Sequence, residues 1–398
     1  MYRNNSFLMD VAEKATVYRV GNSTIRLQGK TLFALVAAAS CAVLFILYVL
    51  LPGNAGGGAF RVNPRFPHDM YFVPAEPYNT TYPLTKPVKV EGGWIKYRIG
   101  VIADMDLKSK SLEEEGHWIS YMKTGFILYN PEFREVKVEW EPPPMGMTLI
   151  KSQWSYGNRG MELSELLVFN GRLYGVDDRT GVVYELDGSN AIPWVILADG
   201  NGRHTKGFKS EWATVKDEHL FVGGFGKEWT SPAGVLINDN PMWVKRISTD
   251  GRVQHWSWKK NFLAIREKLD IKEPGYVIHE TGGWSELHRK WFFLPRRVSK
   301  ERYDDKLDEH MGANHMLIAN EDFSALEDVL VGDVTPTHGF SSFKFLPDSG
   351  DDIIVALKSE EDDGNVSTYI LAFDIKGKIL LPETLILKDY KFEGVEFI

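Results

Sequence analysis

From residue 93 to the C-terminus, apolar residues recur in short runs that are separated by turn residues such as Gly, Asn, Asp and Pro. The clearest runs read YRIGVIAD, ELLVFN, VVYELDG, KWFFLPRR, IIVALKS and TYILAFDI. Short apolar runs between turn signals predict β-strands. Helical periodicity is confined to two stretches, at 262–270 and around 299–309. The pattern predicts an all-β fold, and about 300 residues of short strands favour a β-propeller over a single sandwich.

The two ends of this strand-rich region predict how the fold closes. The last run, FEGVEFI, has no hairpin partner after it, and the first run, YRIGVIADMD, has none before it. If the two runs pair in one sheet, the propeller becomes a closed ring without an exposed edge. We therefore expect residues 97–106 and 392–398 to share a sheet.

The N-terminal part has a different pattern. Residues 31–51 form a run without any charge, and about 20 apolar residues span a bilayer as a helix. Lys and Arg residues precede the run, so the positive-inside rule places the N-terminus in the cytosol. A cleaved signal peptide is the alternative, but its apolar core and its leader would both be shorter. We predict a cytosolic tail (1–30), a transmembrane signal-anchor helix (31–51), a luminal stem (52–85) and a propeller domain (86–398).

Composition limits the kinds of partner that the chain can bind and indicates the compartment in which it lies. The net charge of −8 argues against a nucleic-acid partner, because binding a phosphate backbone requires a positive surface. The single cysteine, Cys41, lies in the apolar run, so the predicted propeller has neither a disulfide nor a thiolate nucleophile. Glycosylation sequons at Asn79 and Asn365 agree with a luminal domain. Cleavage in the glycine-rich stem would release a secreted form.

Five oxygen-bearing residues stand at the heads of successive hairpin patterns, 47 to 69 residues apart. This spacing is about the length of one propeller blade with its loops. If each blade directs one oxygen toward the central axis, the axis becomes a cage that suits Ca²⁺. The five residues are Ser164, Glu211, Glu280, Ser341 and Glu393.

Familiar catalytic motifs are missing from the sequence. It contains no HExxH zinc motif and no GxSxG elbow, and GGFGKEW lacks the Ser or Thr of a phosphate loop. His310 and His315 lie in a polar stretch and are expected in solvent. Charged residues gather instead at predicted strand ends, which meet at a common mouth in a propeller and could there handle phosphate. They are Asp104, Asp106, Asp177, Asp178, Arg179, Glu211, Lys227, Glu228, Arg296 and Arg297.

Several long motifs carry a resemblance to a known family. They include SELLVFNGRLYGVDDRTGVVYEL, GFKSEWATVKDEHLFVGGFGKEW, WFFLPRR and PTHGFSSFKF. With these motifs, the sequence from about residue 78 onward resembles the calcium-activated nucleotidases, also called the apyrase family. The likeness is greatest to membrane-anchored members of the secretory pathway.

The resemblance implies a five-bladed β-propeller with Ca²⁺ in its central tunnel. It implies hydrolysis of nucleoside diphosphates, with UDP and GDP preferred, in the endoplasmic reticulum or Golgi, where removal of UDP aids glycosylation and quality control. Relatives dimerise, so a homodimer is compatible with it. The family's calcium ligands correspond to Ser164, Glu211, Glu280, Ser341 and Glu393, and Glu165 stands as an additional ligand where relatives have Asp.

The nucleotide-handling residues complete the hypothesis. Asp104, Asp106 or Asp178 would orient the attacking water, and Arg296 would offset the phosphate charge. Trp229 or Trp284 would stack on the base, although a core position suits each equally well. The other expected substrate-binding residues are Arg179, Lys227 and Glu228. The alternative is a luminal scaffold that binds glycans or proteins and in which Ca²⁺ is purely structural, since propellers serve both roles.

Overall fold

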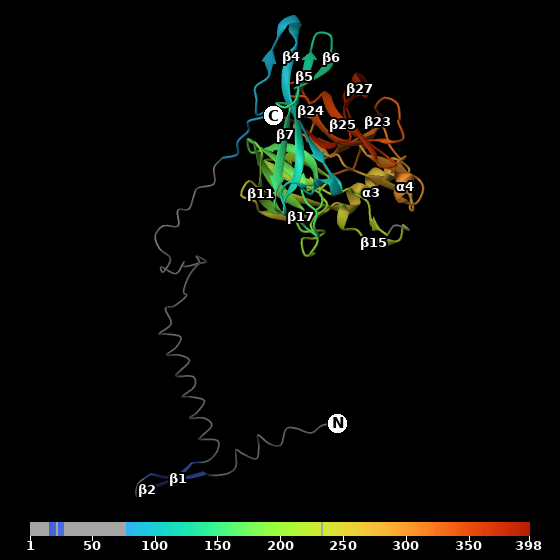
Figure 1. Cartoon of the computed structure of the whole chain (residues 1–398). Helices are drawn as coiled ribbons and strands as arrows, with labels where there is room; N and C mark the ends of the chain where they lie inside the picture. Colours follow the sequence, from blue (N-terminus) through green and yellow to red (C-terminus); the bar gives the residue numbers. More distant parts are fainter. Residues whose placement is uncertain (1–15, 21–22, 28–76, 232–233) are drawn as a thin grey trace. The chain divides into compact units, whose positions relative to one another are not determined.

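The computed structural model describes residues 16–20, 23–27, 77–231 and 234–398 (Figure 1). The chain divides into two compact units, Met1–Pro74 and Ala75–Ile398. In the first unit, β1 (Thr16–Val20) and β2 (Ser23–Leu27) form an antiparallel hairpin. The predicted anchor at 31–51 lies outside the described residues, as does the stem up to residue 76. Within the described residues, no helix has the length and apolar character needed to cross a membrane.

The second unit is built almost entirely of antiparallel sheet, so the all-β prediction is confirmed. Three of its sheets have four strands each, connected in sequence order. The first contains β12 (Trp212–Lys216), β13 (His219–Gly223), β16 (Trp243–Ile247) and β17 (Val253–Ser257). The second contains β19 (Gly283–Ser285), β20 (Lys290–Phe293), β22 (His315–Asn320) and β23 (Leu326–Leu330). The third contains β24 (His338–Phe345), β25 (Ile353–Asp362), β26 (Asn365–Asp374) and β27 (Ile379–Lys388).

The remaining large sheet has ten strands. Its main order is β28 (Lys391–Phe397), β4 (Ile95–Asp104), β5 (Trp118–Asn130), β7 (Met147–Ser152), β11 (Asn190–Ile196), β10 (Val182–Asp187), β9 (Arg172–Asp177) and β8 (Leu163–Phe169). β3 (Val88–Lys89) pairs with β4, and β6 (Glu135–Trp140) pairs with β5. Only one parallel residue pair, Lys151 with Asn190, joins β7 to β11, so this sheet consists of two groups of strands that are linked at that place by a single ladder pair.

The pairing predicted between the first and last long strands is confirmed. β28 runs antiparallel to β4, with Phe397 opposite Ile99 and Lys391 opposite Asp104. The last strand of the chain therefore completes the sheet that the first long strand begins. This pairing covers one edge of each strand, which would otherwise be open to other chains.

Short elements connect the sheets. They are β14 (Trp229–Thr230), β15 (Leu236–Asn238), β18 (Tyr276–Ile278), β21 (Arg297–Ser299), α3 (Lys259–Lys268), α4 (Asp305–Asp308) and the 3₁₀ turns at Glu91–Gly93, Asp106–Ser109 and Asn240–Met242. The helix predicted at 262–270 is confirmed by α3, which buries Phe262 and Ile265 on one face. The predicted stretch at 299–309 contains only the single turn α4, whose N-terminus is capped by the Asp304 carboxylate.

Five strands, β8, β12, β19, β24 and β28, contact one another across the sheets and are called the inner strands below. β28 contacts both β8 and β24, β8 contacts β12, and β12 contacts β19. Gly283 of β19 approaches Phe343 of β24 so closely that a Cβ atom on Gly283 would lie 2.5 Å from the phenyl ring. The contacts among the five strands therefore form a closed series. Apolar cores fill the spaces between neighbouring sheets, for example around Trp212 and Trp291.

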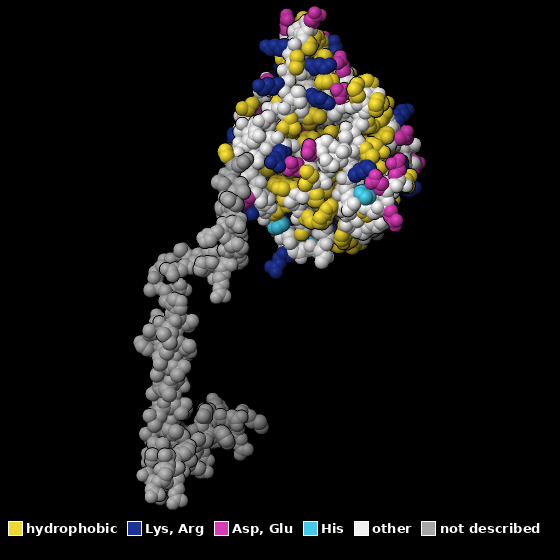
Figure 2. Space-filling view, turned by 60° about the vertical axis from the view of Figure 1, so that its left-hand side comes forward, with side chains coloured by type: hydrophobic (Ala, Val, Ile, Leu, Met, Phe, Trp, Pro, Cys, Tyr) yellow, Lys and Arg dark blue, Asp and Glu magenta, His cyan; other side chains and the backbone are white. Residues whose placement is uncertain are grey.

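The outer surface of the second unit carries both signs of charge. On the face shown in Figure 2, Lys and Arg side chains are scattered among Asp, Glu and hydrophobic side chains. This face has no continuous positive region of the kind that a nucleic-acid backbone requires.

Candidate active site

A cavity of about 660 Å³ opens where the inner strands begin. Glu162 precedes β8, Glu211 precedes β12 and Glu280 precedes β19, and all three line the cavity. Lys391 and Glu393 enter it from the first residues of β28. Since these residues are far apart in sequence, the contacts among the inner strands are what bring them together.

Three of the predicted calcium ligands converge in this cavity. Glu211, Glu280 and Glu393 all line it. Burial raises the pKa of each of these carboxyls, and the charge of Glu280 adds to the rise at Glu211 and Glu393. Buried carboxylates that repel one another favour a bound cation, which would remove both costs.

The predicted serine ligands occupy irregular positions in their strands. The pairing register skips Ser164 between Leu163 and Glu165, and it skips Ser341 between Phe340 and Ser342. Glu393 is skipped in the same way in β28. A β-bulge takes a residue out of the ladder and changes the direction of its groups. The hydroxyls of both serines donate to backbone carbonyls, Ser164 to Ser210 and Ser341 to Phe392.

Glu165 belongs to a different environment. Its carboxylate accepts a hydrogen bond from Ser342 Oγ at 2.8 Å and pairs with Lys344 Nζ at 3.0 Å. It does not line the cavity that holds the three glutamates. Burial raises the pKa of Glu165 to about 7 despite the charge of Lys344. The structure thus separates Glu165 from the carboxylates with which it was grouped.

Three cations bind the carboxylates of the cavity. Lys209 pairs with Asp178 and, at 2.8 Å, with Glu211. Arg296 pairs with Glu280 and lies 2.9 Å from Glu393 and 3.0 Å from Glu361. Lys391 lies 2.9 Å from Asp104, 3.0 Å from Asp106 and 3.3 Å from Glu361. The predicted site residues Asp104, Asp106, Asp178 and Arg296 are therefore brought together in one cavity, where Lys391 and Glu361 connect the two aspartates to Arg296 and Lys209 binds Asp178 separately.

Sequence reasoning missed Lys209, Lys391 and Glu361. Burial alone would raise the pKa of Glu361, but the charges of Arg296 and Lys391 outweigh burial and lower it to about 2. A signal for the two lysines was present, since each stands two residues before a predicted ligand, Glu211 or Glu393. Residues two apart in an extended chain point to the same side.

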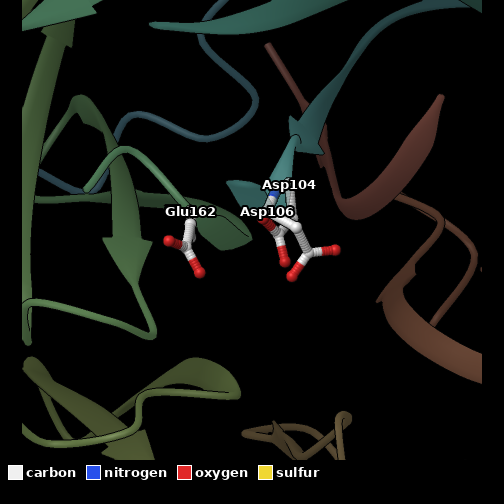
Figure 3. Close-up of side chains that lie close together, drawn as sticks. All are labelled: Asp104, Asp106 and Glu162. Atoms are coloured by element: carbon white, nitrogen blue, oxygen red, sulfur yellow. The ribbon is translucent and has the colours of Figure 1, made fainter. Parts of the chain in front are cut away.

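Asp104 and Asp106 also meet a third carboxylate, that of Glu162 (Figure 3). One oxygen of each residue lies within 4.8 Å of the others, an arrangement that could hold a metal ion. Arg159 Nε donates to Glu162 at 2.7 Å, and the guanidinium lies 3.7 Å from Asp106. This acidic corner is therefore partly neutralised by the protein itself. Glu162 and Arg159 were not predicted.

The turn at 177–179 supplies two further cavity residues. Asp177 is buried, and its Oδ1 accepts hydrogen bonds from the backbone N–H groups of Arg179 at 2.8 Å and Thr180 at 2.9 Å. Asp177 thus holds the turn, while Asp178 and Arg179 both line the cavity. This division between a carboxylate that holds the turn and one that lines the cavity follows from the turn geometry.

An aromatic wall stands at one side of the cavity. Phe225, Trp229 and Tyr303 line it. Lys206 Nζ lies 4.0 Å from the centroid of the Trp229 ring, and Lys227 Nζ lies 4.2 Å from that of Tyr303. The wall offers flat surfaces on which a base could stack.

Two predicted base- or substrate-binding residues lie elsewhere. The Glu228 carboxylate accepts two hydrogen bonds from Arg266 Nη1, at 2.9 and 3.0 Å, and lines a neighbouring cavity instead. Trp284 lines another cavity, which shares no residue with the active-site cavity. Of the two tryptophans considered for stacking, only Trp229 faces the charged network.

Comparison with known proteins decides the family. A family model described as Apyrase matches residues 105–398. The chain belongs to the apyrase family. Apyrase relatives include soluble calcium-activated nucleotidase 1 of Rattus norvegicus, 52% identical over 81% of this chain and 78% of the relative. An apyrase of Cimex lectularius is 46% identical over 80% of this chain and 87% of the relative. Apyrase apy-1 of Caenorhabditis elegans is 44% identical over 78% of this chain and 86% of the relative.

Membership of the apyrase family confirms the resemblance found in the sequence and makes the chain a nucleotide-hydrolysing enzyme. The name of the rat relative indicates calcium. The residues of this apyrase cavity fit that ion, because its lining contains carboxylates and no histidine or cysteine among the described residues. Oxygen-only donor sets suit Ca²⁺ rather than zinc or copper.

Proposed function

We propose that this chain is a Ca²⁺-dependent nucleoside diphosphatase that hydrolyses UDP and GDP to the monophosphate and phosphate. The observation that carries the proposal is the convergence of Glu211, Glu280 and Glu393 in one cavity that also holds basic and aromatic side chains. A purely structural calcium would need neither the cations nor the aromatic wall. A diphosphate with a base needs both.

We infer that the five inner strands belong to the five blades of a propeller. The closed series of contacts among β8, β12, β19, β24 and β28 supports this arrangement. The ten-stranded sheet then counts as two blades, because a single residue pair, Lys151 with Asn190, links β7 to β11. The three carboxylates and the carbonyls of Ser164 and Ser341 would hold Ca²⁺ near the axis.

Bound Ca²⁺ would polarise the phosphate oxygens of the substrate. Asp104, Asp106 or Asp178 would hold a water molecule in line with the terminal phosphorus and accept its proton. A new P–O bond would form as the bridging P–O bond breaks, which releases the monophosphate. Arg296 and Arg179 would offset the charge on the phosphates. Trp229 would stack on the base.

The cellular setting of the proposal rests on the N-terminal sequence. The uncharged run at 31–51 supports a type II membrane protein whose catalytic domain lies in the lumen of the endoplasmic reticulum or Golgi. There, hydrolysis of UDP would support glycosylation. A soluble form would arise by cleavage in the stem.

The first experiment replaces Glu211 by Gln and measures phosphate release from UDP with Ca²⁺ and with a chelator. We expect the wild-type chain to need Ca²⁺ and the variant to lose that activity while retaining its β-sheet circular-dichroism spectrum. The matched control is Glu132→Gln, a change at an exposed glutamate outside the cavities. Wild-type turnover by Glu211→Gln would contradict the assignment of the ligand. A wild-type chain that turned over no UDP under either condition would favour the scaffold.

A further inference from the structure

A second cavity, of about 670 Å³, lies toward the other ends of the inner strands. It shares no lining residue with the candidate active site. On β28, Lys391 and Glu393 face the active-site cavity, whereas Glu396 faces the second cavity. In the β19 region, Glu280 lines the active-site cavity, whereas Trp284 lines the second cavity. A ligand in the second cavity would therefore leave the nucleotide-handling residues untouched.

The aromatic lining of this cavity provides apolar surfaces. Tyr82 is 44% exposed, yet its hydroxyl donates a hydrogen bond to Glu396 Oε1 at 3.0 Å. An exposed ring with an anchored hydroxyl presents a fixed surface at little further entropy cost. The other aromatic lining residues are Tyr78, Trp284, Phe343 and Phe345.

The polar groups of the lining are mostly hydrogen-bond acceptors. Among the described residues, neither Glu218 nor Asp348 has a hydrogen-bond or ion-pair partner for its carboxylate, and both line the cavity. Trp284 supplies the complementary group, because it is only 5% exposed and its Nε1 donor has no partner in the described part of the chain. An unpaired buried donor carries a free-energy cost that a ligand oxygen would remove.

Charge excludes one class of ligand. Lys344 is the only positive side chain that lines the cavity in the described structure, and it already pairs with Glu165. Carboxylates outnumber it, so phosphate, sulfate and carboxylate groups on a ligand would be repelled. The cavity thus suits a ligand with an apolar face, several hydroxyl donors and no negative charge.

We propose that the second cavity binds a short neutral oligosaccharide. A sugar ring has a C–H face that packs on an aromatic ring, and its hydroxyls donate hydrogen bonds to carboxylates. Tyr82 supplies the stacking surface, Glu218 and Asp348 accept from the hydroxyls, and Trp284 Nε1 donates to a ring or hydroxyl oxygen. The volume falls within the range of small-molecule sites.

The sugar has two potential sources. Asn79, in the first glycosylation sequon, also lines this cavity. Its own glycan or the glycan of a separate molecule could therefore supply the sugar. Thr81→Ala removes the sequon and keeps Asn79, whose Oδ1 accepts from the Thr81 backbone N–H at 2.9 Å. If the glycan of Asn79 fills the cavity, a free oligosaccharide should bind Thr81→Ala more tightly than the glycosylated chain. Equal binding would identify a separate source.

The test uses the full-length chain from a eukaryotic secretory expression system and saturation-transfer NMR with four probes. They are chitobiose, mannotriose, a sulfated heparin disaccharide and spermine. We expect saturation transfer to at least one neutral oligosaccharide and none to the heparin disaccharide. In the Thr81→Ala background, Tyr82→Ala should weaken that binding about three- to tenfold through loss of stacking, whereas Tyr82→Phe should keep it. The matched control is Tyr156→Ala, because Tyr156 is 42% exposed and lines none of the cavities described above.

Three results would overturn the proposal. They are binding of spermine without any oligosaccharide, no transfer to any oligosaccharide in the Thr81→Ala chain, and equal affinity of Tyr82→Ala and Tyr156→Ala. Phosphate release from UDP should be the same in the wild type and Tyr82→Ala. The measurement of sugar binding therefore tests the second cavity independently of the proposed hydrolysis.

Discussion

The two ends of the inner strands carry opposite kinds of site. At the first end, Lys209, Arg296 and Lys391 each contact two or more carboxylates, so that each of these three cations has several partners. At the second end, aromatic rings dominate, and Glu218 and Asp348 have free carboxylates in the described structure. We therefore expect the first end to bind a highly charged ligand and the second end to bind a neutral one.

This difference arises within single strands. Along β28, the Glu393 carboxylate accepts a hydrogen bond from Arg296. The Glu396 carboxylate accepts hydrogen bonds from the Tyr82 hydroxyl and from the backbone N–H of Val168. The two glutamates are three residues apart, and the bulge at Glu393 changes the direction of the side chains between them. One strand therefore serves two chemically distinct cavities.

The largest expected effect tests the network at the first end. Arg296→Met removes the cation shared by Glu280, Glu361 and Glu393. Breaking a buried ion pair on one side costs about 3–5 kcal/mol, and we expect a loss of that size in the free energy of unfolding in urea with a chelator present. Added Ca²⁺ should restore part of it, because a metal ion can take over the charge.

The control for Arg296→Met is Arg302→Met, a change at an exposed arginine with no ion-pair partner among the described residues. It should leave the unfolding midpoint close to that of the wild type. Equal losses in the two variants would mean that the network at the first end does not stabilise the fold.

The next largest effect concerns the contribution of Glu165 to the pH dependence of stability. Burial raises the pKa of Glu165 from 4.5 to about 7 in the folded protein. Between these values the folded chain keeps a proton that the unfolded chain releases, so stability falls as pH rises through this window, by up to about 3 kcal/mol. The free energy of unfolding, measured with urea between pH 4.5 and 8, should therefore depend less on pH in Glu165→Gln than in the wild type.

Because Glu165 pairs with Lys344 away from the active-site cavity, Glu165→Gln should retain Ca²⁺-dependent phosphate release. Loss of activity, with the pH dependence of stability unchanged, would return Glu165 to the set of calcium ligands.

The smallest effect tests the closure between the inner strands. Gly283→Ala would place a Cβ atom 2.5 Å from the Phe343 ring, at the contact between β19 and β24. Overpacking of this kind costs about 1–3 kcal/mol, which thermal unfolding would detect as a lower midpoint. The control is Gly175→Ala, where the nearest atom would lie 3.4 Å away. A midpoint unchanged by Gly283→Ala would show that the contact is loose.

Much of this organisation could be predicted from local sequence. Short apolar runs with turn residues specified the strands, and the unpaired first and last runs predicted the pairing of β4 with β28. The spaced glutamates predicted three carboxylates that do share a cavity. Of the cations that pair with these carboxylates, Arg296 was predicted, whereas Lys209 and Lys391 were missed because neither carries a motif of its own.

The different positions of Glu165 and Glu211 show what a linear pattern determines and what it leaves open. Strand positions, turn chemistry and family could be read from the linear sequence, because alternation and turn preference depend on neighbouring residues. The identity of the cation that each carboxylate meets, and of the cavity that each aromatic residue faces, became known from the folded structure alone. Those choices depend on bulges and on contacts between strands distant in sequence, and electrostatic energy depends on the resulting distances in space.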